Sequence, residues 1–121
     1  MRVGIVDRDT LFRAELRNFL LSAGFAQISV ASDLPESLGD MAVQDVWLLD
    51  EDVWCPWNEA LLRRILRAAP HALIVSMIRP PDAIRPAEAL AADPRVRHMV
   101  KTDFSRSLLP LLMEAGGGDT P

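Results

Sequence analysis

Short apolar runs alternate with helical periods of apolar residues along the whole chain. The runs are rich in β-branched residues and are bounded by polar residues, a pattern that is typical of buried strands. They predict five strands, over residues 1–6, 27–31, 46–49, 72–75 and 96–100. Strands that alternate with helices favour parallel pairing through right-handed crossovers. We therefore expect an α/β fold, with a doubly wound five-stranded parallel sheet covered by helices on both faces.

The segments between the strands carry the helical pattern. Apolar residues spaced three and four apart predict a first helix that Asp9 or Thr10 caps and that ends at Gly24. Further patterns predict a short helix over residues 34–41, a third over residues 61–69, a fourth that starts near Pro86, and a last helix, capped by Ser105 or Ser107, that contains Pro110 and runs to residue 115.

Composition matters mainly through what it excludes. The 121 residues match the size of one domain, which we place at residues 1–115, with residues 116–121 as a flexible tail or the start of a linker. The net charge of −4 argues against direct nucleic-acid binding by this domain. No apolar run has the length of a membrane span, and the lone Cys55 fits a reducing compartment. We therefore expect a cytoplasmic protein.

Polar residues that could take part in catalysis or ligand binding lie at the ends of four of the predicted strands. In a doubly wound sheet, ligands bind just beyond the carboxyl ends of the strands. We expect one edge of the sheet to gather Asp7, Arg8 and Asp9 after the first strand, Asp50 and Asp52 after the third, Ser76 at the end of the fourth, and Lys101 after the fifth. Acids, a hydroxyl and a lysine at one edge are a stronger signal than any of these residues alone.

These motifs, in this order, carry a family resemblance along nearly the whole chain. The resemblance lies in four segments: Val3-Gly4-Ile5-Val6-Asp7 with its following helix, Val46-Trp47-Leu48-Leu49-Asp50, Ile74-Val75-Ser76 and Val100-Lys101. In these segments the chain resembles the receiver domain of two-component response regulators, above all those with a helix-turn-helix output domain. The resemblance implies a flavodoxin-like receiver fold and a signalling switch rather than a metabolic enzyme. It also implies a sensor histidine kinase or another signalling protein as partner, and a role in transcription regulation.

The resemblance also implies roles for single residues. Asp50 would be the phosphoacceptor, assisted by Lys101, with Mg²⁺ held by Asp7 and Asp50. The hydroxyl of Ser76 would bind the phosphoryl group and move together with the side chain at the family's aromatic switch position, here His98. The output surface would involve the fifth strand and the last two helices, where we expect a homodimer or another partner interface.

Several positions depart from the family pattern. Arg8 replaces the second acid of the family's acidic pair, and a guanidinium cannot bind Mg²⁺. Asp9 and Asp52 are candidates to restore part of the metal site, so we expect Mg²⁺ binding to be weak or absent. His98 replaces the aromatic residue, and Thr102 stands where a proline is common. Two interpretations remain: ordinary phosphorylation of Asp50, or a phosphorylation-independent pseudo-receiver in which Arg8 pairs with Asp50. We favour the second because Arg8 replaces a direct metal ligand.

A different class of protein shares part of the pattern. Asp7-Arg8-Asp9-Thr10 after a first strand is similar to the nucleophile motif of haloacid-dehalogenase-type phosphatases. In that interpretation Asp7 is the nucleophile, Asp9 the general acid, and Ser76 and Lys101 bind phosphate. The family's glycine between Asp9 and Thr10 is missing, and the chain is short for that fold. The two classes differ in where a covalent phosphate forms, on Asp7 or on Asp50.

Overall fold

The computed structural model describes residues 1–33, 44–54, 59–79 and 92–117. The predicted helices over 34–41 and near Pro86 lie outside these residues, as do Cys55 and Trp57. The elements, in chain order, are β1 (Arg2–Val6), α1 (Thr10–Ser22), β2 (Gln27–Ala31), β3 (Val46–Asp50), the 3₁₀ helix η2 (Glu51–Trp54), α2 (Glu59–Ala68), β4 (Leu73–Ile78), β5 (Val96–Val100), the 3₁₀ helix η4 (Lys101–Asp103) and α4 (Phe104–Gly117).

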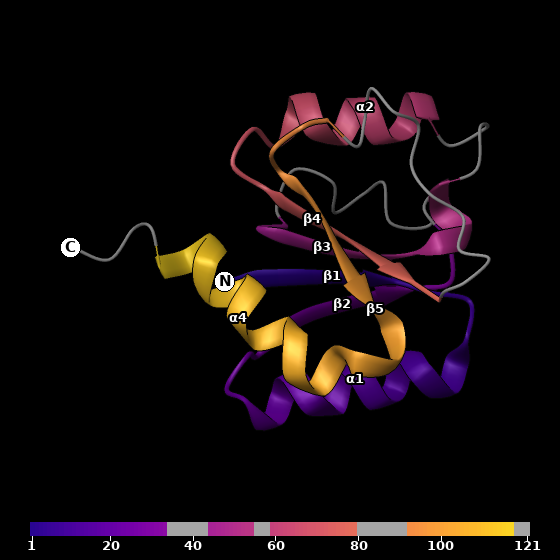
Figure 1. The fold of residues 1–121 in the computed structure, drawn as a ribbon, viewed down its shortest axis with the longest axis vertical. Helices are drawn as coiled ribbons and strands as arrows, with labels where there is room; N and C mark the ends of the chain where they lie inside the picture. The colour runs from indigo at the N-terminus through magenta and orange to yellow at the C-terminus, as the bar shows by residue number, and fades with distance from the viewer. Residues whose placement is uncertain (34–43, 55–58, 80–91, 118–121) are drawn as a thin grey trace.

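The strands form one parallel sheet in the order β2-β1-β3-β4-β5. This order is that of flavodoxin-like doubly wound sheets, so the predicted fold class is confirmed. Figure 1 shows α2 above the sheet and α1 and α4 below it. Within the described ranges, no helix combines the length and the apolar character that a membrane span requires.

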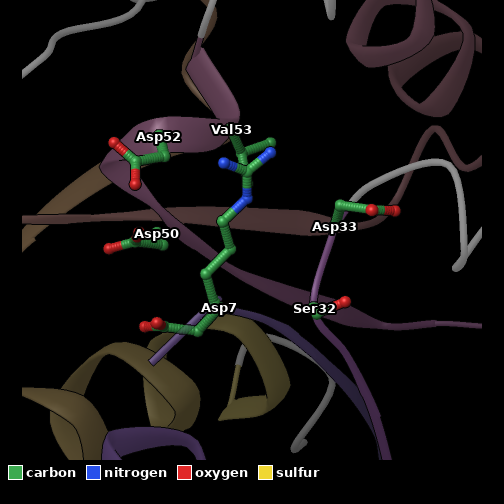
Figure 2. A pocket seen from close by; sticks show the side chains of 7 residues that line it. Asp7, Ser32, Asp33, Asp50, Asp52 and Val53 are labelled. Atoms are coloured by element: carbon green, nitrogen blue, oxygen red, sulfur yellow. The ribbon is translucent and has the colours of Figure 1, made fainter. Parts of the chain in front are cut away.

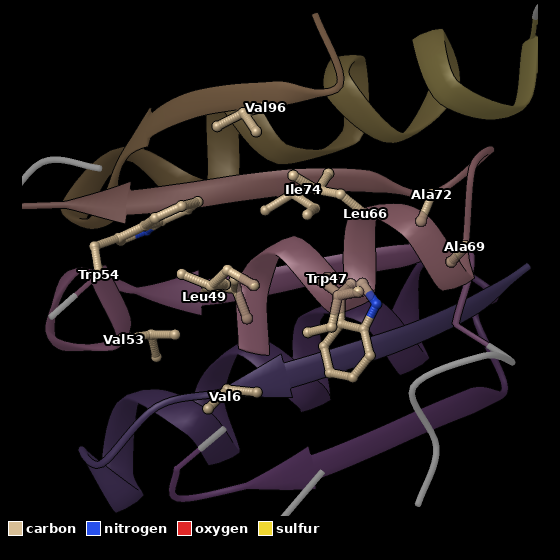
Figure 3. Close-up of a cluster of buried hydrophobic side chains, with 12 residues drawn as sticks. Val6, Trp47, Leu49, Val53, Trp54, Leu66, Ala69, Ala72, Ile74 and Val96 are labelled. Atoms are coloured by element: carbon tan, nitrogen blue, oxygen red, sulfur yellow. The ribbon is translucent and has the colours of Figure 1, made fainter. Parts of the chain in front are cut away.

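Alternation along the strands divides the core into two clusters, one on each face of the sheet. The cluster beneath α2 contains both described tryptophans, Trp47 and Trp54, which lie at opposite ends of it in Figure 3. The cluster beneath α1 and α4 contains Leu16, Leu108 and the buried edge of Phe104. Each strand therefore sends successive residues into different cores, and the parity of a position decides which helices its side chain meets.

The ends of α1 follow the sequence signals. Asp9 is its N-cap, and the Asp9 carboxylate accepts a hydrogen bond from the backbone N–H of Phe12 at 3.1 Å. Gly24 follows the helix with φ of 99°, a backbone conformation that glycine adopts without a steric penalty.

Two predicted boundaries near the site were wrong. β4 continues two residues past Ser76 to Ile78, so Ser76 lies inside the strand rather than at its end. The last helix begins at Phe104, directly after η4, so neither Ser105 nor Ser107 is its N-cap. Pro110 is accommodated inside α4, which continues to Gly117. In both cases the element extends by one or more residues beyond the polar residue that was predicted as its boundary.

Candidate functional site at the carboxyl edge of the sheet

Two carboxylates and one ammonium group meet where three strands end. Asp7 follows β1, Asp50 ends β3, and Lys101 follows β5. The Lys101 Nζ lies 2.8 Å from Asp7 Oδ2 and donates a hydrogen bond to Asp50 Oδ1 at 3.0 Å. All three residues are buried, with at most 3% of their surface exposed. Of the predicted site residues, the structure thus brings these three together as one buried ion triad.

Burial sets the electrostatics of this triad. Loss of hydration raises the pKa of Asp7 above its ordinary value, against the opposing effects of the Lys101 ammonium and of the Asp9 backbone N–H, which donates to Asp7 Oδ1 at 2.8 Å. The negative charge of Asp50 raises the Asp7 pKa further. One ammonium serves two carboxylates, so the triad keeps a net charge of about −1 when both acids are ionised.

Aromatic residues from two helices hold Lys101 in place. Its Nζ lies 4.4 Å from the centre of the Phe12 ring, a cation–π contact. Phe104 of α4 packs edge-on against Phe12 and Phe19 of α1, with ring centres 5.5 and 5.3 Å apart. The position of the ammonium therefore depends on the packing of α1 against α4.

The open side of the triad is a small pocket on the β2 side of the sheet. It is lined by Asp7, Arg8, Ser32, Asp33, Asp50, Asp52 and Val53. In Figure 2 the carboxylates of Asp7 and Asp50 point the same way, whereas that of Asp33 points away from them. Arg8 is exposed, and the cation that contacts Asp50 is Lys101. The expected pairing of Arg8 with Asp50 stays a prediction.

Asp9 lies outside this pocket. Its carboxylate caps α1, as described above, and its side chain is exposed. Asp52 does line the pocket, as a part of η2. Of the two acids considered as additional metal ligands, only Asp52 therefore lines the pocket beside the triad.

Ser76 lies on the other face of the sheet. The register pairs Asp50 with Met77 and places Ser76 beside Leu49 and His98. Because side chains alternate between faces, the Ser76 hydroxyl points toward the α2 side, whereas Asp50 points toward α1 and α4. Ser76 does not line the pocket. A switch built from Ser76 and His98 stays a prediction: the register places these two residues side by side but puts Ser76 on the face opposite to Asp50.

The donor set was tested for magnesium. Mg²⁺ takes a near-octahedral shell of oxygen atoms, supplied by carboxylates and water. Here both buried carboxylates already contact Lys101, and the next residue after Asp7 is Arg8, whose guanidinium cannot bind Mg²⁺. Among the described residues, no group of three acidic, histidine or cysteine side chains is placed to hold a metal ion. The residues present therefore do not fit a magnesium site in this arrangement.

Some of these site residues escaped the sequence analysis. Ser32 and Asp33 directly follow β2, so the strand-end rule used for the other strands could have found them. Phe12 belongs to the apolar pattern of the first helix, and nothing in that spacing indicates its contact with Lys101. Arg13 of α1 donates from Nη1 to the Asp7 carbonyl oxygen at 2.9 Å, a contact that the helical pattern does not indicate.

Comparisons with known proteins bear on the fold. No protein-family model and no curated protein sequence matches the chain. A response regulator receiver domain protein (CheY-like) from Methanospirillum hungatei has a similar structure, with a TM-score of 0.68, 15% identity and 97% of each chain covered. A Burkholderia pseudomallei protein, provisionally described as pilus assembly-related, has a TM-score of 0.73 and 14% identity over 97% of this chain and 90% of its own. The chain therefore has the receiver fold.

Proposed function

We propose that this chain is an atypical receiver domain that signals through protein contacts without being phosphorylated. The observation that carries the proposal is Arg8, which lines the pocket beside Asp7 and Asp50 and, as a guanidinium, cannot bind a metal ion there. With Arg8 at the open side, the pocket lacks the ligands that would recruit a metal and a phosphodonor together.

The proposal makes the domain a binding module rather than an enzyme. Its partners would be a sensor histidine kinase that it no longer needs as a phosphodonor, or another signalling protein in the cytoplasm. A homodimer and a link to transcription regulation, through a helix-turn-helix output domain, belong to the same proposal and rest on the resemblance of the sequence. Sedimentation at rising protein concentration tests the dimer.

Ordinary phosphorylation of Asp50 is the second candidate. The observation in its favour is that Asp50 and Lys101 lie together at the carboxyl end of the sheet, as a phosphoacceptor and its assisting lysine would. The phosphatase interpretation is weaker. Its general acid, Asp9, is exposed and engaged as the N-cap of α1, and neither structural comparison concerns a phosphatase.

The test is reaction with a small-molecule phosphodonor in the presence of Mg²⁺, followed by intact mass. We expect no phosphoryl adduct on the wild-type protein, and an adduct on Arg8→Asp that disappears in the double variant Arg8→Asp/Asp50→Asn. Arg64→Asp, an equal change of charge on exposed α2, is the matched control and should stay unlabelled.

The other outcomes separate the three interpretations. A wild-type adduct that Asp50→Asn removes would establish an ordinary receiver and overturn the proposal. A wild-type adduct that survives in Asp50→Asn and is lost in Asp7→Asn would establish the phosphatase nucleophile. If Arg8→Asp stays unlabelled while Arg8→Asp/Lys101→Met gains the adduct, the lysine rather than the arginine keeps the site closed.

A further inference from the structure

A groove with a basic wall runs between α1 and the edge strand β2, away from the ion triad. It is lined by Thr10, Arg13, Ala14, Arg17, Ile28 and Val30. The floor is apolar, and 46% of the Val30 surface is exposed. The wall on the α1 side carries two guanidinium groups one helical turn apart. Apolar surface next to exposed cations on a small domain is a feature that binding sites share.

The strand that borders this groove has an outer edge that no described strand covers. Among the described strands, β2 is the end member of the sheet and pairs only with β1. The carbonyl oxygen of Ala31 accepts a hydrogen bond from the Asp7 backbone N–H, so the backbone groups of Ala31 face β1. Because these groups alternate along a strand, the N–H and C=O of Ile28 and Val30 face the open edge. An edge of this kind is a template for another strand.

The same alternation places the side chains of Ile28 and Val30 on the α1 side of the sheet, where the groove lies. A strand added beside β2 would direct every second side chain toward α1 and its arginines. Arg17 is exposed, and Arg13 is half-buried with one Nη donating to the Asp7 carbonyl. Within the described ranges neither guanidinium forms an ion pair with a carboxylate. Carboxylates at alternate positions of the added strand would supply these partners.

We propose that this groove binds an extended acidic segment of a partner protein, which adds to β2 as a strand and pairs its carboxylates with Arg13 and Arg17. Strand addition of this type draws affinity from main-chain hydrogen bonds and specificity from alternate side chains. A second copy of this chain fits less well. Antiparallel pairing of two β2 edges about a two-fold axis would put both α1 helices on one face, with arginines facing arginines.

Binding is tested on the whole chain without a phosphodonor, so the result does not depend on the proposal for Asp50. The probe is a pool of fluorescent heptapeptides with glutamate at alternate positions and valine, isoleucine or threonine between them. A pool with lysine in place of glutamate is the charge control. Fluorescence anisotropy should show binding of the glutamate pool that weakens with added salt.

Two variants probe the two halves of the proposal, the ion pairs and the added strand, and each has a control variant. Arg17→Glu should weaken binding about tenfold through the lost ion pair and the added repulsion. Val30→Pro removes an N–H that faces the open edge and leaves the β1 ladder intact, so it should abolish strand addition. Val30→Thr keeps that N–H and should bind as the wild type does. Arg64→Glu, on the opposite face of the sheet, should have no effect.

Several outcomes would overturn the proposal. They are absence of binding by the glutamate pool, equal binding of the lysine pool, equal loss in Arg64→Glu and Arg17→Glu, or full binding by a folded Val30→Pro variant. A concentration-dependent dimer that Val30→Pro dissociates, together with no peptide binding, would assign this edge to a second copy of the chain. Circular dichroism establishes that each variant is folded, and Arg17→Glu decides the matter if Val30→Pro is not.

Discussion

The two faces of the sheet differ in whether their buried polar atoms have partners. On the side of α1 and α4, the Lys101 ammonium lies within 3.0 Å of the carboxylates of Asp7 and Asp50, so Asp7 Oδ2, which accepts no hydrogen bond from a described residue, is still paired with an opposite charge. On the α2 side, the Ser76 hydroxyl and the indole N–H groups of Trp47 and Trp54 are buried without a hydrogen-bond partner among the described residues. An unpaired buried charge costs far more than an unpaired neutral dipole. We therefore expect the stability contributed by the α1 and α4 face to depend on its ion pairs, and that contributed by the α2 face to depend on its apolar packing.

Removing the ammonium should have the largest effect. Lys101→Met leaves two buried carboxylates facing each other, and we expect it to lower the free energy of unfolding at pH 7 by about 3–5 kcal/mol. Urea denaturation measures this difference. The triple variant Asp7→Asn/Asp50→Asn/Lys101→Met should recover most of the loss, because no charge remains to be compensated. A loss in Lys101→Met below about 1 kcal/mol would mean that solvent screens the triad.

A packing change on the opposite face should come next. A β-carbon on Gly4 would lie 3.2 Å from the Gln44 Cγ and 3.2 Å from the Trp47 Cε3, closer than these atoms tolerate without moving. We expect Gly4→Ala to destabilise the protein by about 1–3 kcal/mol through overpacking. The combination with Trp47→Phe should remove part of this penalty. Additive effects of the two substitutions in urea denaturation would argue against a clash with the indole.

Substitution of Asp7 should have a smaller effect, and it should raise rather than lower the free energy of unfolding. Because its pKa is raised on folding, the folded protein binds a proton more readily than the unfolded chain, and stability falls as the pH rises through the interval above the ordinary value of 3.8. Asp7→Asn removes this cost while the Asp50–Lys101 pair remains. We expect a gain in the free energy of unfolding at pH 7 that disappears as the pH approaches the ordinary value. Denaturation curves for both proteins across this range test it, and a loss at pH 7 would contradict it.

The smallest effect should be that of Ser76→Ala. The hydroxyl has no partner in the described part of the structure, so its removal should change the free energy of unfolding by no more than about 0.5 kcal/mol, or stabilise the protein slightly. The same variant sharpens the contrast between the faces. If Ser76→Ala alters the reaction of Arg8→Asp with a phosphodonor, the two faces are coupled, as the predicted switch with His98 requires.

Prediction from sequence succeeded where a local pattern carries the information. The second and fifth strands were predicted to the residue, and Asp9 and Gly24 mark the ends of α1 as expected. Strand ends in a parallel sheet share one edge, so the meeting of Asp7, Asp50 and Lys101 needed no knowledge of distances. The rule failed at Ser76, because a buried strand can include a small polar residue and continue beyond it.

The sequence by itself determined the five strands, their parallel pairing and the edge at which the charged residues gather. These features follow from the period of the apolar residues and from the chirality of the crossovers, which act along the chain. Only the tertiary structure decided which charges touch. The register of β3 on β4 sends Asp50 and Ser76 to opposite faces, and the packing of Phe12 against Phe104 sets the ammonium of Lys101 between two acids. A shift of one residue in register would exchange the two faces, and no local pattern in the chain fixes that choice.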